Sequence, residues 1–200
     1  MHVSSILHRS PEADAVDHRV FLHGVTWDQL ETFLAIRGDA AGVRIAYLEG
    51  ELELMSPSVH HERIKKTIAR LLEAYAEERN IELNGFGSWT LRSAPRERAV
   101  EPDECYVLGT EPGDAPDLAI EVNWTHGGLS KLSIYAGLGV KELWLWRDGA
   151  LTPHVLRGDT YVAVDRSEFL PDLDLQLLAS FVSEPSQMQA VRAFRAALRS

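Results

Sequence analysis

The order of hydrophobic and polar positions predicts one α/β domain at residues 19–200, after a tail at residues 1–18 that we expect to be mobile. The tail mixes His, Ser, Pro, Asp and Glu without any period. Beyond it, some segments repeat apolar residues at helical spacing, while others alternate or run continuously apolar, as strands do. The mixture indicates an α/β class with a single core, which a chain of 200 residues can bury.

Start signals and apolar spacing predict five helices. The run from Thr26 to Gln29 has the sequence of a capping box, and Ser56-Pro57 is a favourable start for the longest helix. Ser130 can cap a further helix, which Gly139 ends. The expected helices span about residues 27–36, 58–79, 131–138, 175–183 and 186–199.

Alternating or continuous apolar residues predict the strands. Residues 44–55 indicate a hairpin that turns at Glu49-Gly50, and residues 151–165 indicate another. The strand at 141–146 is almost continuously apolar, which favours a central position in the sheet. Further strands are expected at about 89–92, 100–108 and 117–124, and the last two should pair antiparallel because the link between them is short.

Carboxylates lie within two of these apolar strands, and a lysine follows them. Asp103 and Glu121 are the two acids, and Lys131 opens the next helix. A carboxylate inside a buried strand loses its hydration, which is costly unless a cation, a metal ion or dense hydrogen bonding compensates it. The three residues therefore indicate an active site, or else Glu121 and Lys131 form a buried structural ion pair.

Metal-assisted hydrolysis uses these residue types. Two carboxylates offer the oxygen ligands that Mg²⁺ prefers, and Mn²⁺ is the alternative ion. The ion neutralises charge that develops on a phosphoryl group and makes a bound water more acidic. A lysine within reach can orient or deprotonate that water and can stabilise negative charge in the transition state.

The longest predicted helix opens with His60-His61-Glu62, for which two interpretations stay open. A polar first turn explains the run, because the helix dipole favours Glu62 at that position. Alternatively, His61 or Glu62 projects from the end of the helix and reaches a metal ion or its water.

Composition narrows the function classes. The net charge of −10 argues against a large, constitutive nucleic-acid surface, but it permits a small metal-centred active site. The single cysteine, Cys105, excludes an intrachain disulfide and a cysteine-based zinc cluster, and we expect it to be a core residue. Because no apolar run is long enough to span a membrane and residues 1–17 are unlike a secretory signal, we expect a cytoplasmic location.

Several motifs, in this order, resemble those of the Uma family of putative restriction endonucleases. The likeness covers about residues 25–182, and its first motif is the hairpin and helix start YLEGELELMSPS at 47–58. The other motifs are strand, helix and strand segments at residues 101–106 (EPDECY), 116–122 (PDLAIEV), 131–139 and 142–146 (ELWLW).

That family is placed in the PD-(D/E)xK nuclease superfamily. The resemblance therefore implies a restriction-endonuclease-like core, with a mixed central sheet flanked by helices, together with an N-terminal helix and hairpin and C-terminal helices. It also implies a Mg²⁺-dependent phosphodiesterase site. Asp103 would be the aspartate of the Pro-Asp motif and Glu121 the acid of the Glu-x-Lys motif, and both would bind the metal together with the Val122 carbonyl.

The sequence departs from the superfamily pattern at one of these positions. Asn123 stands where a lysine is usual, so the resemblance implies that Lys131 supplies the charge from the following helix. Glu62, and less closely His61, would match the acidic residue that the first core helix contributes to catalysis.

Two classes of function follow from this reasoning. The first is a metal-dependent endonuclease that hydrolyses phosphodiester bonds of DNA, as a possible homodimer because a duplex has two strands to cut. The second is a catalytically inactive nuclease-fold scaffold, or a nucleic-acid-binding or assembly protein. A nuclease predicts that Asp103, Glu121 and Lys131 converge in a cleft bordered by some of the cations Arg63, Lys65, Lys66, Arg92, Arg96 and Arg98.

Overall fold

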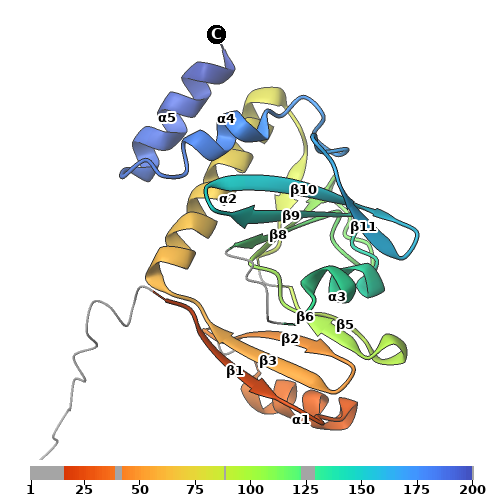
Figure 1. Cartoon of the computed structure of the whole chain (residues 1–200). Coiled ribbons are helices and arrows are strands. Elements are labelled where there is room, and N and C mark those ends of the chain that lie inside the picture. Colours follow the sequence, from red (N-terminus) through yellow and green to blue (C-terminus); the bar gives the residue numbers. More distant parts are fainter. Residues whose placement is uncertain (1–15, 39–41, 88, 123–128, 200) are drawn as a thin grey trace, which may run out of the picture.

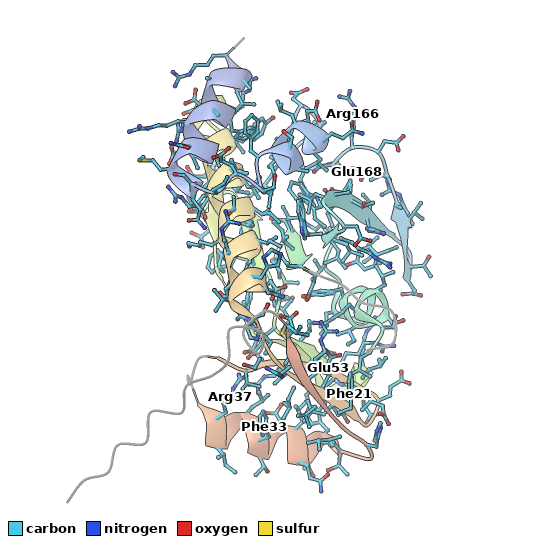
Figure 2. The ribbon with its side chains drawn as sticks, turned by 60° about the vertical axis from the view of Figure 1, so that its left-hand side comes forward. Phe21, Phe33, Arg37, Glu53, Arg166 and Glu168 are labelled. Carbon is cyan, nitrogen blue, oxygen red and sulfur yellow. The ribbon has the colours of Figure 1, made fainter. Side chains whose placement is uncertain are left out.

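The computed structural model describes residues 16–38, 42–87, 89–122 and 129–199, and every structural statement below concerns these ranges. Two β-sheets and the helices form successive layers (Figure 1). The expected α/β class is confirmed. Figure 2 labels residues in both parts of the molecule. The part built on the smaller sheet contains Phe21, Phe33, Arg37 and Glu53, and the part built on the larger sheet contains Arg166 and Glu168.

The smaller sheet is antiparallel, with the strand order β1-β3-β2-β6-β5. Its centre is the hairpin predicted from the sequence. Helix α1 (Trp27–Arg37) covers one face and buries Leu30 completely. The strands are β1 (His18–Leu22), β2 (Arg44–Leu48), β3 (Glu51–Ser56), β5 (Leu91–Ser93) and β6 (Arg98–Val100).

The larger sheet is mixed, with the strand order β11-β10-β9-β8-β7-β4. The pair β8·β9 is parallel and the other pairs are antiparallel, including the predicted pair β7·β8. The apolar strand β9 is internal, as its composition indicated. The strands are β4 (Leu83–Gly85), β7 (Glu104–Leu108), β8 (Leu118–Val122), β9 (Glu142–Arg147), β10 (Ala150–Arg157) and β11 (Thr160–Ala163).

Helices cover both faces of the larger sheet. One face packs against α2 (Val59–Arg79), α4 (Leu175–Ser180) and α5 (Gln187–Leu198), and the other packs against α3 (Lys131–Leu138). The side chains around α3 also include residues of β2, β5 and β6, so this helix lies between the two sheets. A short 3₁₀ helix (Ala94–Arg96) joins β5 to β6. The restriction-endonuclease-like arrangement expected from the sequence is therefore present.

The segment predicted as one strand over residues 100–108 is two strands in different sheets. Strand β6 ends at Val100 in the smaller sheet, and β7 starts at Glu104 in the larger one. Pro102 lies between them, and a proline has no N–H to donate to a ladder. The prediction of a single strand was wrong because apolar residues continue across the crossover, so the pattern alone does not show where the chain changes sheet.

The structure describes the end of the predicted N-terminal tail. Residues 1–15 of the expected tail lie outside the described residues, but Asp17 is hydrogen-bonded and His18 opens β1. The strand at 18–22 and the short strand β4 had not been predicted.

Within the described ranges, no helix combines the length and the apolar character needed to cross a membrane. Cys105 is fully buried, as expected, and burial raises its pKa to about 11.

The capping box before α1 is present and allows a test of its contribution to stability. The Thr26 hydroxyl accepts from the amide of Gln29, and the Gln29 side chain accepts from the amide of Thr26. Thr26→Ala leaves that first-turn amide without its partner, so the free energy of unfolding should fall by about 1 kcal/mol. Urea unfolding at constant m-value measures the change. Thr32→Ala, on the same helix, is the control, and an equal loss in both variants would contradict a capping effect.

Candidate active site

The crossover between the two sheets, residues 101–103, is anchored by side-chain hydrogen bonds. At one end Glu101 is buried, and the Arg37 guanidinium binds both of its carboxylate oxygens. The Thr90 hydroxyl donates to the same carboxylate at 2.8 Å, and the Ile45 amide donates to it at 3.3 Å. These bonds anchor Glu101 to α1 and to β2, two residues before Asp103.

Asp103 lies beside Glu121 at the start of β7. The antiparallel register pairs Glu104 with Ile120, and one further residue along the register brings Asp103 opposite Glu121. The amide of Val122 donates to Asp103 Oδ2 at 2.9 Å. Both carboxylates are almost completely buried, with 1% of Asp103 and 3% of Glu121 exposed. The two predicted acids therefore meet.

Lys131 reaches the same place from the first turn of α3. Its Nζ donates to Glu121 Oε1 at 3.2 Å, and the hydroxyl of Tyr135, one turn further along the helix, donates to the same oxygen. Ser130 positions this turn, since its hydroxyl accepts from the amide of Ser133. The predicted convergence of Asp103, Glu121 and Lys131 is thus present, and so is the ion pair of the alternative interpretation.

His61 is the fourth member of the cluster and is completely buried. Its Nε2 lies 3.0 Å from Asp103 Oδ1, and its Nδ1 lies 3.0 Å from Asp17 Oδ2. Asp17 precedes β1 and also accepts from the amide of Ser58, the N-cap residue of α2, at 2.8 Å. The start of the described chain therefore fixes the ring that faces Asp103.

The charges around His61 perturb its pKa and that of Asp103. Burial lowers the pKa of His61, but the carboxylates of Asp103 and Asp17 outweigh burial and raise it to about 9. Burial raises the pKa of Asp103, but His61, the Val122 amide and Lys131 together hold it below its usual value. Without a metal ion, the imidazolium of His61 therefore compensates the buried carboxylate of Asp103.

Glu121 has the opposite shift. Burial raises its pKa, the nearby charge of Asp103 raises it further, and Lys131 and Tyr135 compensate only part of this effect. Two adjacent carboxylates with pKa shifts of opposite sign are typical of active sites, where added positive charge would let both ionise.

The donor atoms fit a divalent ion that keeps several waters. Within the described ranges, no group of three or more His, Cys, Asp or Glu side chains is arranged to hold a metal ion. Two carboxylates together with waters are nevertheless a usual ligand set for Mg²⁺, which proteins bind through one or two carboxylates. Asp103 Oδ1 is buried, and in the described part of the chain it is paired with His61 Nε2 at 3.0 Å without a hydrogen bond of good geometry. An ion would satisfy this oxygen, which is otherwise costly to bury.

Three further residues were predicted to belong to the site or to lie beside it, namely Glu62, Val122 and Asn123. Glu62 pairs with Lys65 at 2.6 Å, and its side chain is 42% exposed, so its catalytic role stays a prediction. Val122 contributes its amide to Asp103, while its carbonyl as a metal ligand stays untested. Asn123, at the usual lysine position, lies outside the described residues.

Several of the cations that the sequence led us to expect beside the site form ion pairs or hydrogen bonds with other residues. Lys65 binds Glu62, Arg92 binds Glu31 at 2.6 Å, and Arg63 donates to the Glu184 carbonyl. Lys66 is exposed on α2, and together with Lys65 it acts electrostatically on Glu104, the residue after Asp103. Arg96 is exposed, and Arg98 pairs with Glu49 at 3.3 Å.

Sequence reasoning missed two contributions to the site. Asp17 was assigned to the tail, because no local pattern indicates that its carboxylate reaches His61. Glu101 precedes the aspartate in the EPDECY motif, but the motif gives no sign of its partner Arg37, which is 64 positions away. The run His60-His61-Glu62 did indicate that the start of this helix contributes to the site, but the sequence did not distinguish His61 from Glu62.

One family model and one solved structure are similar to this chain. No curated protein matches the sequence. A solved structure from Anabaena variabilis ATCC 29413, described as "a putative nuclease belonging to DUF820", is similar with a TM-score of 0.49 and 14% sequence identity, over 69% of this chain and 90% of that one. The family described as "Uma2: Putative restriction endonuclease" matches residues 30–186, which include Asp103, Glu121 and Lys131. The match extends over more than half of the sequence, and the chain therefore belongs to the Uma2 family of putative restriction endonucleases.

Proposed function

We propose that this chain is a metal-dependent endonuclease that hydrolyses phosphodiester bonds of DNA by means of a metal-activated water. The observation that carries the proposal is the convergence of Asp103, Glu121 and Lys131 in one buried cluster. The family to which the chain belongs supports a nuclease, and the ion, the DNA substrate and the mechanism are our proposal.

Each residue has a task that follows from its position. Asp103 and Glu121 would hold Mg²⁺ or Mn²⁺, which supplies a Lewis acid and an acidic water when bound. Lys131 is held by Glu121 at the edge of the cluster, where its ammonium can orient the attacking water and stabilise charge on the phosphoryl oxygens. Tyr135 fixes the orientation of Glu121. The Val122 amide fixes Asp103, so both acids are positioned before the substrate binds.

A second candidate is a catalytically inactive nuclease fold that binds nucleic acid or assembles with other proteins. One observation favours it: Lys131 and Tyr135 both donate to Oε1 of Glu121, as a purely structural ion pair would require. Such a protein would bind nucleic acid without consuming it.

A cleavage assay separates the two candidates. The purified chain is incubated with labelled single-stranded and double-stranded DNA and RNA, with Mg²⁺, with Mn²⁺ and with EDTA. A nuclease should cleave at least one DNA substrate with a divalent ion, and EDTA should abolish the cleavage. Asp103→Ala is the paired control from the same purification. Equal cleavage by both proteins would indicate a contaminant or another site, and binding without any cleavage would favour the second candidate.

A further inference from the structure

We infer that Arg98 is a positioning residue, which holds α3 and with it Lys131 in place against Glu121. The inference rests on the proposed function, and it gives a role to a residue that the sequence suggested only as a cation beside the cleft. Arg98 lies in β6 of the smaller sheet, whereas Glu121 lies in β8 of the larger one. Helix α3 lies between the larger sheet and strands β5 and β6 (Figure 1).

Helix α3 contacts the two sheets through opposite sides. Towards the larger sheet, Lys131 donates to Glu121 Oε1 at 3.2 Å, and Tyr135, one turn further, donates to the same oxygen. Towards the smaller sheet, the carbonyl of Ser133 accepts from Arg98 Nε at 3.1 Å. Ser133 follows Lys131 by two residues, which places it on nearly the opposite side of a helix with about 3.6 residues per turn. A shift of the helix against Arg98 is therefore also a shift of Lys131 against Glu121.

Three acceptors fix the guanidinium of Arg98. Besides the Ser133 carbonyl, it donates to the Arg96 carbonyl at 2.9 Å and to Glu49 Oε1 at 3.3 Å. The side chain is only 22% exposed. A planar guanidinium donates in several fixed directions at once, whereas a lysine ammonium is a single point charge on a flexible stem. Arg98 thus ties α3 to the hairpin turn at Glu49 and to the 3₁₀ helix that ends at Arg96.

Gly137 shows how closely Arg98 packs on α3. It lies one turn after Ser133, and a Cβ atom added to it would lie 2.2 Å from Cδ and 2.6 Å from Nε of Arg98. These atoms cannot move aside freely, because the guanidinium beyond them is bonded to three acceptors. Glycine is otherwise an unfavourable residue within a helix. The close approach of Arg98 is therefore the physical reason for glycine at this position.

Apolar packing alone does not fix α3 along its axis. In one apolar cluster, the buried residues Ile134 and Tyr135 of α3 lie with side chains of the smaller sheet, namely Ala46, Leu91 and Val100. The hydrophobic effect has no direction, so such contacts tolerate a small slide of the helix. The bond from Arg98 to Ser133 is directional and adds this constraint. Its loss matters for catalysis, because a displacement of about 1 Å at a catalytic group can lower the rate by about 100-fold.

Cleavage by Arg98 variants tests the inference. Arg98→Ala should lower kcat by about 100-fold and leave KM within about threefold of wild type, because Lys131 is displaced while the substrate surface is kept. Arg98→Lys should lose almost as much, since it keeps the charge but not the planar fork. A raised KM in Arg98→Ala together with wild-type kinetics in Arg98→Lys would overturn the inference, because this result indicates a direct contact with a substrate phosphate. Arg166→Ala is the control, since this exposed arginine also donates to a backbone carbonyl (Figure 2).

Gly137→Ala tests the same contact from the side of the helix. In the wild-type background it should lower kcat by about tenfold, because the added methyl group displaces Arg98 and shifts the helix. In the Arg98→Ala background it should cause no further loss, since the methyl group then has room and alanine is the better helix former. Additive losses in the double variant would contradict the inference, because additivity is the mark of independent sites.

Chemical labelling of Lys131 tests the inference without any cleavage. Under trace acetylation followed by mass spectrometry, Lys131 should react several-fold faster in Arg98→Ala than in wild type, because its ammonium leaves Glu121. Lys65 is the internal reference, because it is similarly buried on α2 and only general unfolding would expose it as well.

The two readouts separate this inference from the proposed function. Unchanged labelling of Lys131, or unchanged kcat in folded Arg98→Ala, would overturn the role of Arg98 and leave the endonuclease intact if the wild type cleaves. If the wild type cleaves no substrate, the proposed function fails. Faster labelling of Lys131 in Arg98→Ala would then still support the positioning of α3 by Arg98, and unchanged labelling would overturn it.

Discussion

Asp103→Asn should lower kcat for metal-dependent cleavage by about 10³-fold, which corresponds to about 4 kcal/mol of transition-state stabilisation. The amide keeps the shape of the side chain and can still accept from the Val122 amide, so the start of β7 should keep its position. It lacks the negative charge that would hold a divalent ion and that pairs with His61. The loss should therefore appear in metal binding and kcat rather than in folding.

The control for this prediction is the stability of the variant. Circular dichroism and thermal unfolding should show a folded protein, and the rate is measured at saturating Mn²⁺ with the substrate that the wild type cleaves best. A variant that is folded and retains more than about a tenth of the wild-type kcat would exclude Asp103 as a metal ligand, because the loss of one such charge costs far more.

Lys131→Met should lower the free energy of unfolding by about 3 kcal/mol and also abolish most cleavage. The methionine leaves Glu121 buried beside Asp103 without its cation, and an uncompensated buried charge is strongly destabilising. Part of this cost is relieved if Glu121 takes up a proton, which its raised pKa favours. Chemical denaturation measures the stability, and the cleavage assay measures the rate.

The double variant Glu121→Gln/Lys131→Met separates the structural role of this ion pair from its proposed catalytic role. Removal of both charges should return the free energy of unfolding to within about 1 kcal/mol of wild type, because a buried ion pair is often replaceable by neutral groups. Activity should not return, since one proposed metal ligand and the ammonium are both absent. Recovery of both stability and cleavage would show that the pair is only structural and would contradict the proposed roles of Glu121 and Lys131.

Local sequence was sufficient for the elements whose causes are local. The capping box at Thr26 and the hairpin turn at Glu49-Gly50 were predicted because each depends on contacts within a few residues. The start of α2 was placed close to its true position, but the assigned signal was wrong: Ser56 ends β3, and Ser58 rather than Ser56-Pro57 caps the helix. The carboxylates of Asp103 and Glu121 were recognised because their apolar surroundings make them costly. The local pattern did not show that the chain leaves one sheet after Val100 and enters another.

The sequence by itself determined the fold class, the family and three members of the cluster, because strand periodicity, helix caps and buried acids leave marks in neighbouring positions. Only the tertiary structure decided that His61 rather than Glu62 faces Asp103, and that Asp17, 44 positions before His61, holds the ring in place. The physical reason is that a long-range contact between carboxylate and imidazole depends on where β1 and α2 pack, and no periodic pattern records that packing.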